Sequence, residues 1–139
     1  MKNNFGFTLM ELMIAIAIVA ILSAVAVPNM IAWRNNAQFN SGVRQVKIAI
    51  EETRMDAIKT NMPSRIDFKG NSFDRVKGDT TVQSHELPPG VTISSSTFAD
   101  DQVQFSSRGM ANNGTVTIQG SAGQTRDIVV AITGTSKIK

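Results

Sequence analysis

Glu11, a carboxylate at the start of a long apolar run, is the residue of this sequence whose chemistry most needs an explanation. The segment that follows, from Leu12 to Trp33, contains no charged side chain. A carboxylate in hydrocarbon costs about 2.5–3.5 kcal/mol on insertion scales. One interpretation is that Glu11 lies in the headgroup region and reaches water. The other is that a cation meets it.

The chain itself contains a source of that cation. No Lys or Arg stands inside the run, but a cut between Gly6 and Phe7 would expose an α-amino group four residues from Glu11. Such an amine has a pKa of about 7.7–8.0 and is mostly protonated at neutral pH. In a low-dielectric bundle of helices, amine and carboxylate attract strongly, and an unpaired partner is expensive. The pattern therefore predicts lateral assembly, with the amine of one chain beside Glu11 of a neighbour.

Other residues give little support for catalysis or metal binding. The chain has no Cys and one His, His85, which excludes disulfides, thiolate metal sites and cysteine nucleophiles. His85 beside Glu86 is interpreted as an exposed loop pair. Ser106-Ser107 lacks the context of an activated nucleophile. Asp100-Asp101 lacks the ligand spacing of a calcium loop. We predict no catalytic residues, no metal and no cofactor.

The charge balance gives only a weak nucleic-acid signal, although the sequence pI is about 9.6. Lys and Arg number 14 and Asp and Glu number 11, for a formal net charge of +3. These charges are spread thinly along the chain. They indicate a mild surface bias and not a polybasic patch.

The apolar run is long enough to span a membrane. About 20 helical residues, each rising about 1.5 Å, cover a hydrocarbon core of roughly 30 Å. A secretory signal peptide would end its apolar region after about 7–15 residues, whereas this run continues to Trp33. We therefore expect residues 7–33 to form a retained membrane helix. Pro28 cannot donate to the carbonyl of Ala24, so the helix should bend or loosen there.

Residues 34–62 are expected to be the amphipathic half of the same helix. Lys47 and Glu51 can pair four residues apart, and Asn61-Met62-Pro63 stops the helix because the residue before Pro avoids helical angles. Apolar or small residues recur at steps of four and three, which makes one stripe that can pack against a sheet. The stripe consists of Phe39, Val43, Val46, Ile50, Thr53 and Ala57.

Residues 63–139 are typical of short strands separated by turn residues. The candidate strands are Arg65–Phe68, Ser72–Val76, Thr80–Gln83, Val91–Ser94, Gln102–Phe105, Thr115–Gln119 and Asp127–Ile132. Asn113-Gly114 suits a hairpin turn. The apolar positions expected to face the helix stripe are Val116, Ile118, Ile128, Val130 and Ile132. The fold class predicted is α+β, with an antiparallel sheet laid over a long N-terminal helix.

The N-terminal residues also resemble a known family. Gly6-Phe7-Thr8-Leu9-Met10-Glu11-Leu12, followed by Ala15 to Leu22 and then Pro28, is similar to the class III leader and N-terminal helix of type IV pilins and type II secretion pseudopilins. The resemblance implies a leader peptide of residues 1–6, cleavage between Gly6 and Phe7 by a prepilin peptidase, and N-methylation of Phe7. It also implies that Glu11, with Thr8 and Pro28, serves assembly of the subunits.

The remainder of the chain resembles the heads of the FimT/GspH-like minor pseudopilins. The similar stretches are Leu87 to Val91, Val103 to Gly109, Asn113 to Ile118 and Ile128 to Gly134. Some members of the FimT-like branch take part in DNA uptake through a basic C-terminal motif. The corresponding stretch ends here in Lys137-Ile138-Lys139, with two lysines and no Arg. Two phosphate contacts would give weak, salt-sensitive binding, and the other interpretation is a solvated tail.

Together the resemblances imply a structural subunit, a minor pilin or pseudopilin of a type IV pilus or type II secretion pseudopilus. Its expected partners are other pilin or pseudopilin subunits, a prepilin peptidase, an inner-membrane assembly platform and membrane lipid. Its expected location is the inner membrane, with one span and a periplasmic head, and then the filament. One alternative is a DNA-binding uptake pilin that uses Lys137 and Lys139. Another is an ordinary single-pass anchored protein that keeps Met1.

Overall fold

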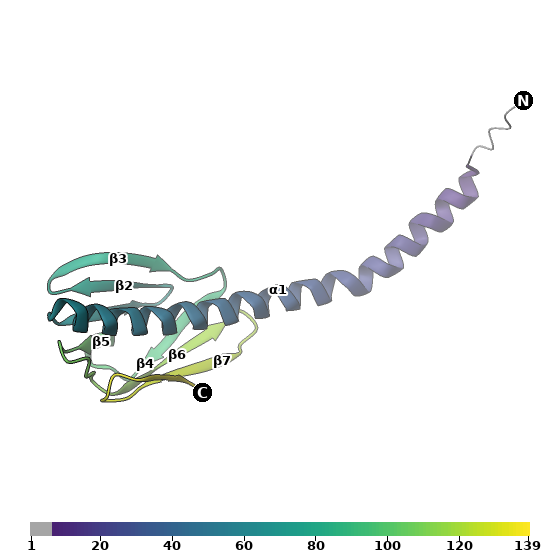
Figure 1. Ribbon diagram of the computed structural model, residues 1–139. Helices are drawn as coiled ribbons and strands as arrows, with labels where there is room; N and C mark the ends of the chain where they lie inside the picture. Colours follow the sequence, from purple (N-terminus) through teal and green to yellow (C-terminus); the bar gives the residue numbers. More distant parts are fainter. Residues whose placement is uncertain (1–6) are drawn as a thin grey trace, which may run out of the picture. The chain divides into compact units, whose positions relative to one another are not determined.

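The computed structural model describes residues 7–139, which form one long helix followed by eight strands (Figure 1). The α+β class predicted from the sequence is confirmed. The chain divides into two compact units between Arg34 and Asn35, and each is described by itself. The elements are α1 (Leu9–Thr60), β1 (Ser64–Lys69), β2 (Ser72–Lys77), β3 (Thr80–Glu86), β4 (Val91–Ser96), η1 (Ala99–Asp101), β5 (Gln102–Phe105), β6 (Gly114–Gly120), β7 (Thr125–Val130) and β8 (Ser136–Ile138).

The C-terminal half of α1 is amphipathic in the way that its sequence predicts. Every residue of the expected stripe is buried, and Gly42 and Ala49 are buried with it. Lys47 Nζ lies 3.0 Å from Glu51 Oε1, so that pair is confirmed. The helix ends at Thr60, and Asn61 follows with φ 50°. Pro63 fixes this boundary because the residue before it avoids the helical region.

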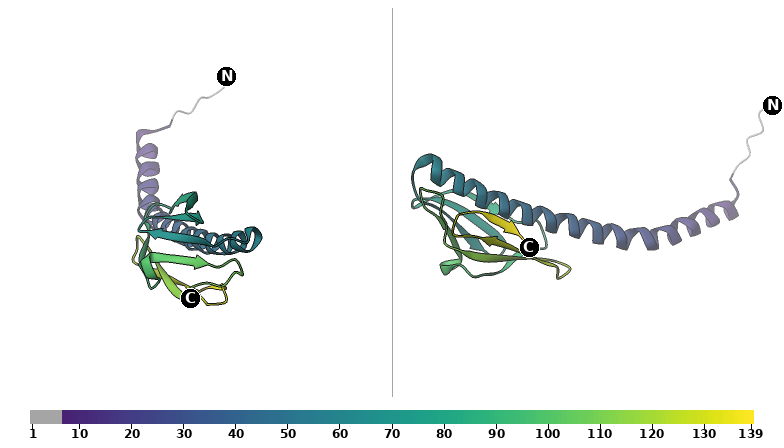
Figure 2. Two further views of the ribbon diagram at one scale, coloured as in Figure 1. Left: turned by 90° about the vertical axis from the view of Figure 1, so that its left-hand side faces the viewer. Right: turned by 60° about the horizontal axis from the view of Figure 1, so that its bottom comes forward.

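The strands form two antiparallel sheets of four strands each, where the sequence analysis expected one sheet. Sheet A has the order β3-β2-β1-β5 and sheet B the order β4-β6-β7-β8. Strands β2 and β3 run along one flank of the C-terminal half of α1, and β6 and β7 run along the other (Figures 1 and 2). The Ile93 N–H of β4 donates to the carbonyl of Gly70, in the turn between β1 and β2, at 2.6 Å and so links the two sheets.

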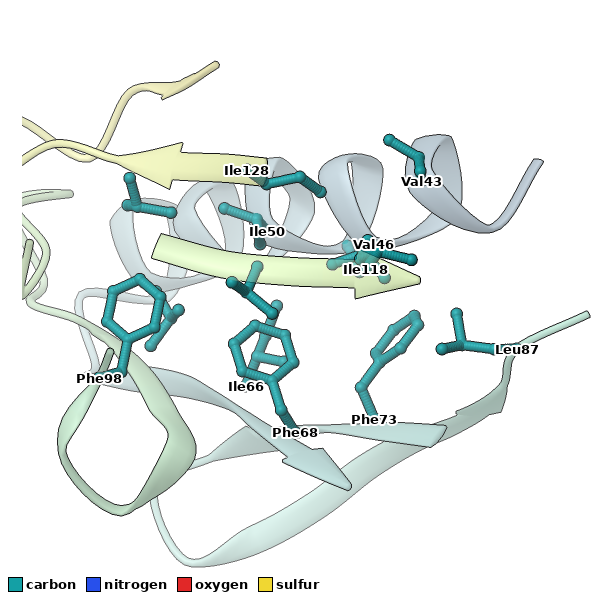
Figure 3. Close-up of a cluster of buried hydrophobic side chains, with 14 of the residues drawn as sticks. Val43, Val46, Ile50, Ile66, Phe68, Phe73, Leu87, Phe98, Ile118 and Ile128 are labelled. Carbon is teal, nitrogen blue, oxygen red and sulfur yellow. The ribbon is translucent and has the colours of Figure 1, made fainter. Parts of the chain in front are cut away.

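A single hydrophobic core fills the space between α1 and the two sheets. Val46 and Ile50 of the helix, Ile66 of sheet A, and Ile118 and Ile128 of sheet B are completely buried. Figure 3 shows these side chains converging from the three layers. Each such side chain contributes about 1.5–3 kcal/mol by leaving water. All the buried residues of this core lie between Phe39 and Val130, so it belongs to the second unit alone.

Two details of strand placement differ from the sequence-based expectation. Strand β7 ends at Val130, and Ile132 lies beyond it with 59% of its surface exposed, so Ile132 does not face the helix. The other four positions expected to face the stripe are fully buried. The turn predicted at Asn113-Gly114 is also wrong. Gly114 instead begins β6 against the Phe98 ring, where a β-carbon would come within 2.5 Å.

The C-terminal residues are ordered, not a solvated tail. Ser136–Ile138 forms strand β8, which pairs with β7 in the register Val129↔Lys137. Lys139 continues this pairing, since its N–H donates to the Asp127 carbonyl at 2.8 Å. Ile138 packs on the core from this strand. One apolar side chain and a free edge of β7 are therefore enough to hold the end of the chain.

Candidate functional site

Thr8 and Glu11 form a reciprocal hydrogen-bonded pair at the start of α1. The Thr8 backbone N–H donates to Glu11 Oε2 at 2.9 Å, and the Thr8 hydroxyl donates to the same oxygen at 3.0 Å. The Glu11 N–H donates in return to Thr8 Oγ1 at 3.2 Å. This is a capping box, in which a Thr N-cap and a Glu three residues later satisfy backbone N–H groups that the first helical turn leaves unpaired.

Sequence reasoning assigned both residues to one site but missed their contact. The Thr-x-x-Glu spacing ahead of an apolar run is the signal that would have found it. Both Thr8 hydrogen bonds use Oε2 of Glu11, and among residues 7–139 no hydrogen bond reaches Oε1. A carboxylate accepts on both oxygens. The cap therefore leaves half of the carboxylate free to receive another donor.

The residues after this cap form a fully exposed apolar helix segment. One 18-residue window of α1 near the N-terminus has a mean hydropathy of 2.6, and none of it is buried. By length and composition this segment can cross a membrane. Phe7, which precedes the cap, is 87% exposed. Pro28 lies inside α1, and the helix continues through it without a break. Gly6, the other half of the expected cleavage site, lies outside the described residues.

Two arginines fix the C-terminal half of α1 to the head. Arg75 of β2 donates to Glu52 at 2.7 Å, to Gln83 at 3.0 Å and to the Thr53 hydroxyl at 3.2 Å, and it also pairs with Asp56. Its side chain is only 12% exposed, so these four acceptors take most of its hydrogen-bonding capacity. This network ties the helix to sheet A.

Arg54 makes the second attachment, to two loops. Its Nε donates to the Gly109 carbonyl at 3.0 Å and its Nη2 to the Thr133 carbonyl at 3.0 Å. Gly109 and Thr133 belong to stretches that the sequence analysis compared with FimT/GspH-like heads. The arginine that joins them was not identified from sequence, because its partners are 55 and 79 residues away along the chain.

The other titratable residues form structural contacts. His85 lies on β3 and stacks on Phe73 with ring centroids 5.2 Å apart, so the predicted exposed loop pair with Glu86 is wrong. Asp74 accepts from Lys69 and from Ser84, which lies at 2.5 Å. These two hydrogen bonds, that of Lys69 being the larger influence, lower the pKa of Asp74. The same contact raises the pKa of Lys69. No group of three or more potential metal ligands occurs among residues 7–139.

The two C-terminal lysines are exposed on an ordered strand. Lys137 lies opposite Val129, and Lys139 lies opposite Asp127. The Asp127 carboxylate accepts a hydrogen bond from Thr117 at 2.8 Å. An acidic residue therefore sits on the strand next to the lysines, which reduces the positive potential that a phosphate backbone would meet.

Comparison with known proteins identifies the family of this chain. The family model "Prokaryotic N-terminal methylation motif" matches residues 1–27, and the model "Type II transport protein GspH" matches residues 42–135. The chain belongs to the GspH family. The match begins at Gly42 on the buried stripe of α1 and ends one residue beyond Gly134, so it contains both arginine attachments.

Curated relatives of this GspH-family chain include two pilus proteins. The Type IV wide pilus major component PilA4 of Thermus thermophilus is 43% identical over 61 residues, which cover 44% of this chain and 47% of that protein. The Type IV major fimbrial protein FimA of Dichelobacter nodosus is 34% identical over 103 residues, which cover 70% of this chain and 65% of that protein. The chain thus spans about half to two thirds of the length of these relatives.

Solved structures share the fold of this chain at low sequence identity. The type IV minor pilin FimU of Pseudomonas aeruginosa has a TM-score of 0.65 and 12% identity, covering 77% of this chain and 92% of that one. The minor pseudopilin EpsH from the type 2 secretion system of Vibrio cholerae has a TM-score of 0.60 and 9% identity, covering 73% and 96%. The fold is therefore the minor pilin and pseudopilin fold.

Proposed function

We propose that this protein is a structural subunit of a type IV pilus or a type II secretion pseudopilus. The single observation that carries the proposal is the Thr8–Glu11 cap in front of a fully exposed apolar helix, on a chain of the GspH family. An exposed apolar surface of this size must be covered by lipid or by other helices. In a subunit that moves from membrane to filament, lipid covers this surface first and neighbouring helices cover it afterwards. The function is not enzymatic.

Assembly, in this proposal, depends on the free oxygen of Glu11. Cleavage between Gly6 and Phe7 by a prepilin peptidase leaves a cationic, N-methylated Phe7 amine. The amine of one subunit pairs with Oε1 of Glu11 on a neighbour, while Oε2 keeps its two hydrogen bonds from Thr8. Two opposite charges close together in a low-dielectric surrounding attract far more strongly than in water. The pair sets the axial stagger between neighbouring helices, and Pro28 loosens the helix where the helices repack.

The proposed location is the inner membrane, with one span and a periplasmic head. The partners are other pilin or pseudopilin subunits, the prepilin peptidase, an inner-membrane assembly platform and lipid. The curated relatives are pilus proteins and the solved neighbours are a minor pilin and a minor pseudopilin. None of their names refers to nucleic acid, and the DNA-uptake alternative rests on Lys137 and Lys139 alone.

The experiment that tests the proposal is the intact mass of the protein extracted from cells that contain the peptidase, and from cells that lack it. With the peptidase, the mass should fall by the mass of Met1–Gly6 and rise by one methyl group. Without it, the full chain should remain. A protein that keeps Met1 in both strains is an ordinary single-pass anchored protein, and the proposal fails. A Gly6→Val variant, which blocks the cut without changing the charge, serves as the matched control.

A further inference from the structure

The apolar segment of α1 ends in a tryptophan and an arginine. Trp33 is the only Trp of the chain, and 70% of its surface is exposed. Arg34 follows directly and is exposed as well. The helix then continues with Asn35 and Asn36. The change from apolar to polar sequence therefore occurs at the pair Trp33 and Arg34.

The other end of this segment is marked by Glu11. Between Glu11 and Trp33 lie the residues 12–32, none of which is charged. At about 1.5 Å per residue they extend over about 32 Å, which is close to the hydrocarbon core of roughly 30 Å. A membrane that is spanned by this segment therefore has Glu11 at one surface and Trp33 at the other.

The polar groups of Trp33 and Arg34 have no partners in the described part of the chain. There, the hydrogen bonds and ion pairs of α1 side chains stop at Glu11 and resume at Asn36. The Trp33 indole carries one N–H donor, the Arg34 guanidinium carries five, and neither group can accept a hydrogen bond. The acceptors for these donors must therefore come from the surroundings of the helix.

The surface of a phospholipid bilayer supplies both things that this pair needs. Water alone would satisfy the N–H groups but would leave the apolar indole ring uncovered. A neighbouring apolar helix would cover the ring, but most of its carbonyl oxygens are already bonded within that helix. Phospholipid places ester carbonyls and phosphates next to hydrocarbon, and Trp is enriched at this level of membranes. A guanidinium pairs with phosphate through two parallel hydrogen bonds.

The direction of the helix also favours lipid as the partner of this pair. In an α-helix every Cα–Cβ bond tilts toward the N-terminus. The side chains of Trp33 and Arg34 therefore lean back toward the apolar segment, and the exposed indole ring lies over its last turn. A donor that leans toward hydrocarbon from just beyond its edge is placed at the level of the headgroups.

We propose that Trp33 and Arg34 form an anchor that binds phospholipid headgroups, with the indole at the ester carbonyls and the guanidinium on a phosphate. The anchor fixes the depth of α1 in the membrane, and so it holds Glu11 at the opposite surface until the subunit leaves the bilayer. This inference rests on the proposed membrane location, but not on processing at Gly6 or on entry into a filament. Both residues of the anchor belong to the first unit.

The test measures the depth of Trp33 in vesicles made of equal parts of phosphatidylcholine and phosphatidylglycerol. The full-length protein is used, and all tryptophan emission comes from this site because the chain has no other Trp. Separate batches of vesicles carry a nitroxide quencher just below the ester carbonyls or near the ends of the acyl chains. We expect the shallow nitroxide to quench the emission about twofold more strongly than the deep one. Stronger quenching by the deep nitroxide overturns the proposal.

Bilayer thickness separates an anchor from a residue that only happens to lie at the surface. The measurement is repeated with phospholipids of shorter and of longer acyl chains. An anchored Trp33 keeps its level, because the helix responds to a change of thickness by changing its tilt. A residue whose depth is set elsewhere on the helix would sink in the thicker bilayers. A shift of the quenching toward the deep nitroxide in those bilayers therefore overturns the proposal.

Matched variants test the contribution of the guanidinium. Arg34→Gln should lower the ratio of shallow to deep quenching about twofold, because the phosphate contact is lost. Arg44→Gln removes an exposed arginine further along the same helix and should leave the ratio unchanged. Equal effects of the two substitutions would overturn the proposal, since net charge alone would then explain them.

Two further outcomes identify which inference fails. Quenching of Trp33 that changes with the ratio of protein to lipid overturns the anchor, because a second copy of the chain would then cover the indole. A protein that inserts into the vesicles but has Trp33 deep in the hydrocarbon, or open to a quencher dissolved in the water, overturns the anchor alone. A protein that does not insert overturns the anchor and the proposed membrane location together.

Discussion

A β-carbon added to Gly134 would lie 2.0 Å from the carbonyl oxygen of Gly109. The two glycines close two turns, in which Gly109 donates to Ser106 and Gly134 to Ala131, both at 2.8 Å. Their φ angles are 77° and 79°, a region that residues with a β-carbon rarely adopt. The two loops can approach this closely only because neither glycine carries a side chain. The Arg54 guanidinium then reaches a carbonyl oxygen in each loop.

Gly134→Ala should therefore destabilise the protein by about 2–4 kcal/mol, through backbone strain and a contact with Gly109 that cannot be relieved by rotating a side chain. Gly123→Ala is the matched control. Gly123 has φ 81°, but a β-carbon there would meet nothing within 4 Å, so only the strain of about 1–2 kcal/mol remains. Denaturant unfolding of both variants measures the difference. Equal losses would show that the contact between the loops does not matter.

Ile128→Ala should destabilise the protein by about 2–5 kcal/mol because it leaves a cavity in the core. Ile132→Ala, four residues further along, should change the free energy of unfolding by no more than about 0.5 kcal/mol. Ile128 is fully buried and Ile132 is 59% exposed. Thermal unfolding of both variants compares them directly. A large effect at Ile132 would mean that β7 extends further than the structure shows.

The Asp74 carboxylate should make stability depend on acid pH. Lys69 and Ser84 lower the pKa of Asp74 in the folded protein. The stabilisation is then fully present above the unfolded pKa of about 3.9 and is lost as pH falls through the lower folded value. Asp74→Asn should lose stability at neutral pH and show a flatter profile below about pH 4. Asp79→Asn, at a fully exposed carboxylate 3.9 Å from Arg65, is the control and should follow the parent profile.

Glu11→Gln separates the two roles of the Glu11 side chain. Gln at this position of a capping box still receives the hydrogen bonds of Thr8, but it has no charge to pair with an amine. We expect Glu11→Gln and Glu11→Ala both to insert into the membrane and fold their heads, and both to be absent from sheared filaments. Thr8→Ala, which keeps the carboxylate, should still enter them. Normal incorporation of Glu11→Gln would leave capping as the only role of Glu11.

Removal of residues 1–34 should leave the head folded. Every buried core residue lies after Arg34, and the division between the two units falls at that point. A fragment of residues 35–139 is expected to unfold cooperatively, within a few degrees of the full chain in detergent. The measurement is far-UV circular dichroism during heating. A fragment without a cooperative transition would show that the head needs the apolar segment to fold.

The helix and seven of the strands could be predicted because their signals are local. The stripe from Phe39 to Ala57 repeats at the helical period, and Gly or Asn separates successive strands. Strand β8 was missed because Ser136–Ile138 contains one apolar residue, and its pairing is decided by the free edge of β7. The division into two sheets depends on the pairing of β1 with β5 and of β4 with β6, strands that are not neighbours in the sequence, so no local pattern indicates it.

The candidate site was predictable only in part, for the same reason. Glu11 stands out from the sequence because a charge at the edge of an apolar run costs free energy. Its contact with Thr8 was also within reach of sequence reasoning, through the spacing of the two residues. The Arg75 network was not, because it joins residues of α1 to β2 across about 20 positions of sequence.

The attachment made by Arg54 has a consequence for the conditions under which the head stays intact. A chain with no Cys cannot join its loops by a disulfide. Here the Arg54 guanidinium joins two loops by hydrogen bonds to two carbonyl oxygens. An arginine side chain stays protonated at any pH that a living cell meets, and carbonyl oxygens do not titrate. This attachment of the loops therefore depends neither on reducing agents nor on pH. Because it contains no disulfide, it forms without an oxidising enzyme.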